Sequence, residues 1–307
     1  MVGYGGSDAA ITLKRRGRLT HPTNPLSTSG GAHGGSGGHM AQLWLNGDLV
    51  ETGAACIAPS DRGFLLADGV FETIRASAGE LLWLADHLAR LRAGAGLLGI
   101  PMPLSDDDIA AGLRDLVCAN ALPDSAVRLT LTRGPSARRG LWPPDEPAAP
   151  TLLATVAPRA APAPGRLIFC GVTRRNEFSP LSRVKYLAYG DAILARREAL
   201  AMGATDAVLL NTAGHAACCT VGNIFVRHED GWATPPLRDG PLPGLARRRL
   251  LKAAGAQERT LTAADIAGAR EIVITNSLGI TPVSHLEGRS LPASSISAEI
   301  DAIYLGP

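Results

Sequence analysis

The stretch from Ser179 to Ala199, "SPLSRVKYLAYGDAILARREA", places one lysine where a loop gives way to a helix. Lys185 sits between Val184 and Tyr186, and the spacing of apolar residues after it predicts a helix over 186–202. Most lysines are solvated, and a lysine at a helix start can be one of these. A lysine beside an apolar, partly desolvated site is different, because burial disfavours the ammonium and lowers its pKa. Lys185 is therefore either a surface residue or a group held in place for chemistry.

Composition bounds the class of protein. The 307 residues are 46% hydrophobic and 19% charged, which is typical of a globular chain large enough for two domains. The net charge of +2 favours neither nucleic acid nor an anionic membrane as partner. The absence of an apolar run of about 18 residues and of a secretory signal leads us to expect a cytoplasmic protein. Five cysteines without metal-ligand spacing predict reduced thiols and no metal site.

Local patterns predict an α/β (α+β) protein with mixed sheets. Residues 1–39 are rich in glycine and serine, so we expect a disordered leader. Strand patterns meet at Asn46-Gly47 and at Ala78-Gly79, which predicts two hairpins. Ser105 precedes a helical pattern and is the expected N-cap.

A proline- and alanine-rich segment at 158–165 divides the remaining chain. Such a composition is typical of a short, stiff connection between domains. We therefore expect a small N-terminal α/β domain at 40–157 and a larger C-terminal domain at 166–307.

The free amine of a desolvated lysine can form a Schiff base with an aldehyde cofactor. If that cofactor carries a phosphate, it needs an arginine and the backbone N–H groups of a helix start. The chain offers Arg90 in "HLARL" and two predicted loop-to-helix junctions, "GPLPGLAR" and "TNSLGITPV".

Together these motifs resemble a known family. "SDRGFLLADGVFETIR", "HLARL", "RRNEFSPLSRVKYL", "GATDAVLLNTAGHAACCTVGNIFV" and "GPLPGLAR" follow one another as in the class IV (fold-type IV) aminotransferases, which use pyridoxal 5′-phosphate. The family includes branched-chain and D-amino acid aminotransferases and 4-amino-4-deoxychorismate lyase. The resemblance runs from Leu43 to about Gly288. It implies a two-domain architecture with the active site between the domains, and a homodimer.

The resemblance also implies roles for individual residues. Lys185 resembles the Schiff-base lysine that moves the substrate proton, and Tyr189 lies beside the cofactor. The implied phosphate ligands are the Arg90 side chain, the backbone amides of Leu245 and Ala246, and the turn at Asn276 and Ser277. The implied substrate-binding residues are Arg138, which resembles a carboxylate-binding arginine, together with Arg133 and Phe64. Each of these arginines could equally be a solvated loop residue.

One position departs from the family pattern. Cys218 stands where the family carries a glutamate that keeps the pyridine nitrogen of the cofactor protonated, and no Asp or Glu occurs from Asn211 to Val226. A thiol in an apolar setting stays neutral and is a weak hydrogen-bond partner.

Three functions remain open at this stage. The first is an aminotransferase acting on an amino acid of D- or branched-chain type and a 2-oxo acid. The second is 4-amino-4-deoxychorismate lyase, which serves 4-aminobenzoate and folate synthesis. The third is a relative that binds pyridoxal phosphate but has weak or lost catalysis because of Cys218.

Overall fold

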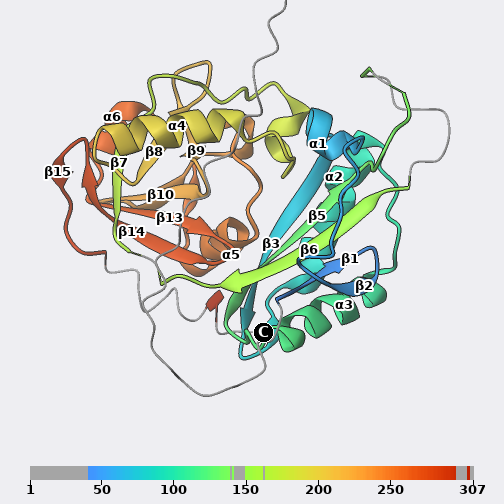
Figure 1. Ribbon diagram of the computed structural model, residues 1–307. Coiled ribbons are helices and arrows are strands. Elements are labelled where there is room, and N and C mark those ends of the chain that lie inside the picture. The colour runs from blue at the N-terminus through green and yellow to red at the C-terminus, as the bar shows by residue number, and fades with distance from the viewer. Residues whose placement is uncertain (1–40, 139, 142–148, 162, 295–302, 305–307) are drawn as a thin grey trace, which may run out of the picture. The chain divides into compact units, whose positions relative to one another are not determined.

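The computed structural model describes residues 41–304 except 139, 142–148, 162 and 295–302. The predicted leader at 1–39 therefore lies outside the described residues. Figure 1 shows two sheets with helices packed on each. No helix in the described part of the chain is long and apolar enough to cross a bilayer.

The first sheet has six strands in the order β2-β1-β6-β5-β3-β4, and all of the pairs are antiparallel. Helix α2 packs against β3 and helix α3 against β1 and β6. The core between these helices and the sheet includes Trp44, Ile74, Leu91 and Leu113. The elements are β1 Gln42–Leu45, β2 Asp48–Glu51, α1 Arg62–Leu66, β3 Gly69–Ser77, β4 Glu80–Leu81, α2 Leu84–Leu98, α3 Asp106–Ala119, β5 Ser125–Thr132 and β6 Thr151–Pro158.

The two turns and the helix cap predicted for the first sheet and its helices are present in the structure. Asn46 and Gly47 adopt positive φ angles of 54° and 109° between β1 and β2, and Ala78 and Gly79 do the same between β3 and β4. Ser105 caps α3 by accepting a hydrogen bond from the Asp108 N–H. Both turns and the cap are confirmed.

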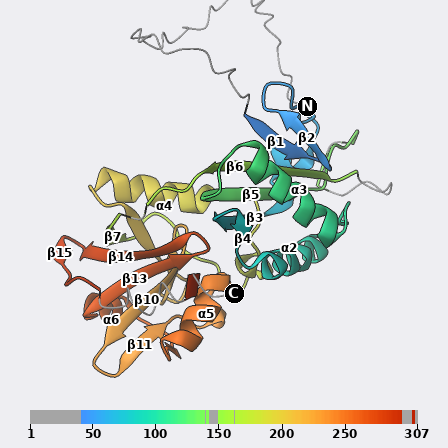
Figure 2. The ribbon, with the colours of Figure 1, turned by 90° about the horizontal axis from the view of Figure 1, so that it is seen from below.

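The second sheet is mixed, with its main path in the order β12-β11-β10-β13-β14-β7-β8-β9. Strand β7 pairs in parallel with β14 and β8, whereas β10, β13 and β14 pair antiparallel. Helix α4 covers β8 (Figure 1), and α5 packs on β13 (Figure 2). The elements are β7 Gly165–Phe169, η1 Pro180–Arg183, α4 Gly190–Ala201, β8 Asp206–Leu210, β9 Ala216–Cys219, β10 Asn223–His228, β11 Gly231–Thr234, η2 Leu237–Asp239, α5 Leu245–Ala253, β12 Gln257–Glu258, α6 Ala263–Ala267, β13 Glu271–Asn276, β14 Gly279–Leu286 and β15 Arg289–Ser290.

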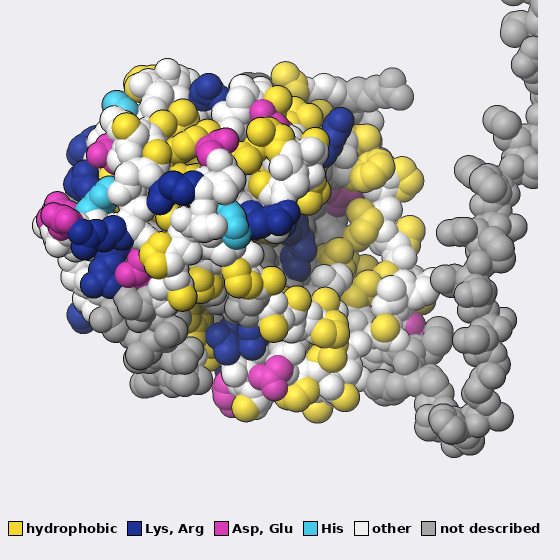
Figure 3. Space-filling model, turned by 90° about the vertical axis from the view of Figure 1, so that its left-hand side faces the viewer, with side chains coloured by type: hydrophobic (Ala, Val, Ile, Leu, Met, Phe, Trp, Pro, Cys, Tyr) yellow, Lys and Arg dark blue, Asp and Glu magenta, His cyan; other side chains and the backbone are white. Residues whose placement is uncertain are grey.

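The chain passes from the first sheet to the second after Pro158, and β7 begins at Gly165. The predicted linker lies in this passage, and the domain bounds stay a prediction. On the face shown in Figure 3, positive and negative side chains are intermixed, so this face presents no field of one sign.

Candidate active site

A cavity of about 850 Å³ lies between the two sheets. Phe71 and Thr73 of β3 and Arg128 of β5 line it from the first sheet, and strands β8 to β10 line it from the second. All eight predicted cofactor-binding residues reach this cavity: Arg90, Lys185, Tyr189, Cys218, Leu245, Ala246, Asn276 and Ser277.

Lys185 lies on an extended segment, and the predicted helix start at 186 is wrong. The Phe71 N–H donates to the Lys185 carbonyl at 2.9 Å, and the Leu187 N–H donates to Gly69 at 3.1 Å. Because this segment pairs with β3, its backbone cannot enter a helix, and α4 begins at Gly190 with Tyr189 as N-cap. The sheet thus holds the backbone of Lys185 at the cavity wall.

The Lys185 amine occupies a site that suits a nucleophile. Its Nζ donates to the Tyr189 hydroxyl at 3.3 Å and lies 4.3 Å from the centre of the Phe71 ring. Burial lowers its pKa from 10.5 to about 8, with Arg90 and Arg128 lowering it further while Glu72 opposes the shift. A substantial fraction of free amine is therefore available near neutral pH.

This pKa predicts how cofactor capture depends on pH. The free amine is the reactive form, so the initial rate at which apoprotein captures pyridoxal phosphate should rise with pH up to about 8 and then level off. The rate can be followed by near-visible absorbance after mixing. A rate that keeps rising to the pKa of an ordinary lysine, about 10.4, would contradict the assigned environment.

Another part of the cavity wall is suited to a phosphate. Gly244 is the N-cap of α5, and among the described residues no side chain caps this helix, so the amides of Leu245 and Ala246 face the cavity. Arg90 reaches the same region, since its Nη1 donates to the Pro243 carbonyl at 3.2 Å. The Asn276 turn closes the site, with the Leu278 N–H donating to Asn276 Oδ1 at 2.9 Å. Amine, helix N-terminus and guanidinium together fit a phosphorylated aldehyde.

Arg90 is held by a carboxylate that the sequence analysis missed. Glu72 is fully buried, and its two oxygens accept from Arg90 Nε at 2.8 Å and Nη2 at 2.7 Å. His87 Nδ1 lies 2.7 Å from the same carboxylate. Burial raises the pKa of Glu72, but the hydrogen bonds from Arg90 and His87 outweigh it and lower the pKa overall. Burial also lowers the pKa of His87, so its neutral imidazole donates to an ionised Glu72.

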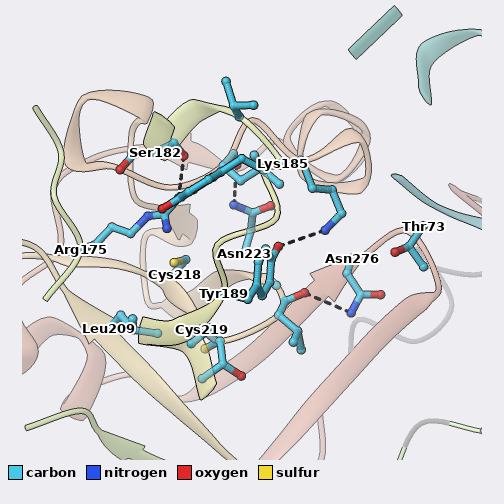
Figure 4. Close-up of a pocket in the computed structure, with 18 of the residues that line it drawn as sticks. Thr73, Arg175, Ser182, Lys185, Tyr189, Leu209, Cys218, Cys219, Asn223 and Asn276 are labelled. Atoms are coloured by element: carbon cyan, nitrogen blue, oxygen red, sulfur yellow. Dashed lines mark hydrogen bonds between the residues drawn. The ribbon is translucent and has the colours of Figure 1, made fainter. Parts of the chain in front are cut away.

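Cys218 lies on β9, paired with Leu209 of β8, and points into the cavity. Burial raises the pKa of the Cys218 thiol, and the positive charge of Arg175 partly offsets this rise. The thiol is therefore neutral, as the sequence suggested. Figure 4 shows Cys218 on the side of the cavity away from Lys185, close to Arg175.

The three predicted substrate residues do not line this cavity. The guanidinium of Arg133 bonds Asp68 at 2.7 Å and the carbonyls of Leu98 and Gly99, so these contacts already occupy its donors, and a substrate-binding role stays a prediction. Phe64 is 77% exposed on α1. Arg138 is exposed on the loop after β5.

Arg128 also lines the cavity, although the sequence motifs did not point to it. Its guanidinium stacks 3.7 Å above the Phe71 ring and has no hydrogen-bond or ion-pair partner among the described residues. Its place in the alternating strand "AVRLTLT" was the available signal, because Arg128 lies opposite Thr73 on the face of the sheet that carries the cavity.

Comparison with known proteins identifies the family. The profile of the class IV amino-transferases (Aminotran_4) matches residues 69–286. The chain is 32% identical over 81% of its length to a Methanocaldococcus jannaschii protein named "Putative branched-chain-amino-acid aminotransferase", covering 88% of that protein. It is 28% identical over 80% of its length to D-alanine aminotransferase of Listeria monocytogenes, again covering 88%.

A solved structure gives the same result. The crystal structure named "Putative 4-amino-4-deoxychorismate lyase" from Legionella pneumophila superposes with a TM-score of 0.74 at 31% identity, covering 83% of this chain and 95% of that one. The predicted fold-type IV architecture is confirmed. With Lys185, Arg90 and an uncapped helix start meeting in one cavity, the chain belongs to the class IV aminotransferase family of pyridoxal-phosphate enzymes.

Proposed function

We propose that this protein is an aminotransferase that moves an amino group between an amino acid of D- or branched-chain type and a 2-oxo acid. The observation that carries the proposal is the Lys185 amine, whose pKa is lowered to about 8 at the wall of a cavity with a phosphate-binding end. Pyridoxal phosphate, when bound, withdraws electrons from the substrate α-carbon. Lys185 takes and returns the proton at that carbon, while Arg90 and the α5 amides hold the phosphate.

The relatives support an aminotransferase over a lyase, since both curated relatives named above are aminotransferases. The Legionella structure keeps 4-amino-4-deoxychorismate lyase as the second candidate. Both reactions require a cation for the substrate carboxylate. The guanidinium of Arg128, which has no ion-pair partner among the described residues, suits that role inside the cavity.

The proposed assembly is a cytoplasmic homodimer. Apolar side chains on α1 and on nearby loops are exposed, and this supports a protein partner. They include Phe64 (77%), Leu65 (58%), Leu141 (82%) and Phe178 (84%). We propose that a second copy covers α1, so that Arg138 serves the cavity of the neighbouring subunit.

Arg138→Ala should raise KM for the amino acid or lower kcat at least tenfold, yet leave cofactor content unchanged, because Arg138 lies outside its own cofactor cavity. Mixed dimers formed from the Arg138→Ala and Lys185→Ala proteins should regain about a quarter of wild-type activity. The reason is that random pairing gives half of the dimers one intact site of two. Unchanged kcat/KM in Arg138→Ala would remove Arg138 from the substrate site, and no recovery on mixing would place it within its own subunit.

One screen tests the proposed function. The purified protein is assayed with D- and L-amino acids against pyruvate or 2-oxoglutarate, with aminodeoxychorismate alongside. Amino transfer to the oxo acid is the expected result. Formation of 4-aminobenzoate and pyruvate would assign the lyase, and a loaded protein inert with all of these would favour the binding role.

A further inference from the structure

Arg175 is held at the cavity wall by backbone carbonyls, and no carboxylate in the described part of the chain pairs with it. Its Nε donates to the Gly240 carbonyl at 2.9 Å and its Nη2 to the Ser182 carbonyl at 2.6 Å. Its own backbone N–H donates to Leu210 at 2.8 Å, which ties it to β8. Within the described ranges it forms no ion pair, and Nη1 has no hydrogen-bond partner. The site therefore presents an uncompensated positive charge with an available donor.

The charge lies at the end of the cavity away from the amine. In Figure 4, Lys185 approaches from one side, Arg175 and Cys218 lie on the other, and Tyr189 stands between them. Among the described residues that line the cavity, Asp191 is the only acid, and its Oδ1 accepts from Thr173 at 2.9 Å. The cationic lining residues are Arg90, Arg128, Arg174, Arg175 and Lys185.

One other described acid, Asp206, lies close enough to Cys218 for its charge to help raise the pKa of the thiol. Asp206, on the neighbouring strand β8, is buried and does not line the cavity. Its Oδ1 already accepts from the Thr220 hydroxyl at 2.5 Å and from the N–H groups of Ala207 and Thr220. Its Oδ2 faces Arg196 at 3.5 Å. The thiol and the guanidinium thus meet at this end, and the Asp206 carboxylate, bonded to Thr220 and facing Arg196, is not among the residues that line the cavity.

The structure of pyridoxal phosphate brings its ring nitrogen to this end. The nitrogen is opposite the ring carbon that bears the aldehyde. With the aldehyde at Lys185 and the phosphate at Arg90 and the start of α5, the nitrogen points away from Lys185. A guanidinium donates to the lone pair of an unprotonated pyridine, whereas it repels a protonated one. A neutral thiol provides no charge to offset that repulsion.

We propose that Arg175 donates to the ring nitrogen of the bound cofactor and, together with Cys218, keeps that nitrogen unprotonated. An unprotonated ring withdraws fewer electrons from the substrate α-carbon, so proton removal depends more heavily on Lys185. Arg175 thus sets the protonation state of the cofactor ring. The neutral thiol of Cys218 permits this because it adds no negative charge beside the nitrogen. The inference rests on the cofactor occupying the cavity that carries Lys185.

The test measures the protonation of the ring directly. The protein is loaded with pyridoxal phosphate carrying nitrogen-15 in the ring, and its nitrogen resonance is recorded by NMR from pH 6 to 9. The expected wild-type spectrum is that of an unprotonated pyridine. Cys218→Glu should raise the pKa of the ring nitrogen by about 1 to 3 units, because a carboxylate then favours the charged ring. Arg175→Gln should raise it as well, by about one unit or more.

Two further variants serve as controls for the effect of Arg175→Gln. Arg175→Lys keeps a cation and should leave the ring unprotonated, and Arg197→Gln changes an exposed arginine of α4 outside the cavity and should change nothing. A protonated ring in the wild type, or a ring pKa that Arg175→Gln does not move, would overturn the inference. Borohydride labelling of Lys185 is checked in every sample. Loss of the label contradicts the proposed function itself, whereas a labelled protein with a protonated ring contradicts only this inference.

Discussion

Lys185→Ala is expected to lower turnover by about 10³-fold or more, since under the proposed function it removes both the attachment point of the cofactor and the group that moves the substrate proton. Such a loss corresponds to roughly 4 kcal/mol of transition-state stabilisation. The cavity keeps its phosphate-binding region in this variant, because the described hydrogen bonds of Arg90 and of the Lys185 amine go to other residues, Pro243 and Tyr189 among them. Cofactor should therefore still bind, noncovalently, and its near-visible absorbance should move toward that of the free aldehyde.

The site of cofactor attachment can be assigned by chemical labelling, because the chain contains three lysines, Lys14, Lys185 and Lys252. Borohydride reduction of the loaded wild type, followed by peptide mapping, should recover the cofactor on Lys185. Lys252→Ala is the matched control, as Lys252 is exposed on α5 and does not line the cavity. Recovery of the label on Lys252 or Lys14, or full turnover in Lys185→Ala, would remove Lys185 from the reaction.

The parts of the fold that the sequence predicted are those with local causes. The positive φ angles at Asn46-Gly47 and the Ser105 cap depend on residues close together in the chain. Both could therefore be predicted from the sequence. The start of α4 was misplaced by four residues because its cause is distant. The hydrogen bonds that Phe71 and Gly69 make with the Lys185 segment come from a strand more than 100 residues earlier.

The site shows the same division. The motifs named the predicted cofactor-binding residues, which line one cavity. The charged partners Glu72 and Arg128 could be recognised only from the folded structure. Glu72 shares the buried face of β3 with Val70 and Ile74, and a lone acid on an apolar face is a signal for an ion pair with the covering helix. The sequence could not show that Asp68 and two helix-end carbonyls already occupy the donors of Arg133.

Arg90→Lys is expected to weaken cofactor binding by about 10- to 100-fold, the second largest effect. A guanidinium bonds phosphate in a fixed geometry, and each hydrogen bond to a charged group contributes roughly 1.5–3 kcal/mol. Lysine retains the charge that Glu72 needs but cannot reach the carboxylate and a phosphate with the same planar set of donors. Equilibrium dialysis or absorbance titration of apoprotein with pyridoxal phosphate gives the dissociation constant.

Alanine is the poorer probe at this position. Arg90→Ala leaves Glu72 buried with His87 as its remaining partner, and breaking a buried ion pair costs roughly 3–5 kcal/mol of folding free energy. Cofactor loss in that variant would mix binding with unfolding, so thermal unfolding of each apoprotein is measured in parallel. Arg92→Lys is the matched control, because Arg92 lies two residues away, is 37% exposed and pairs with Asp106 at 2.6 Å outside the cavity. The exposed ion pair between Arg92 and Asp106 contributes little to the stability of the fold. Equal losses of cofactor affinity in Arg90→Lys and Arg92→Lys, with both proteins folded, would mean that the phosphate binds elsewhere in the cavity.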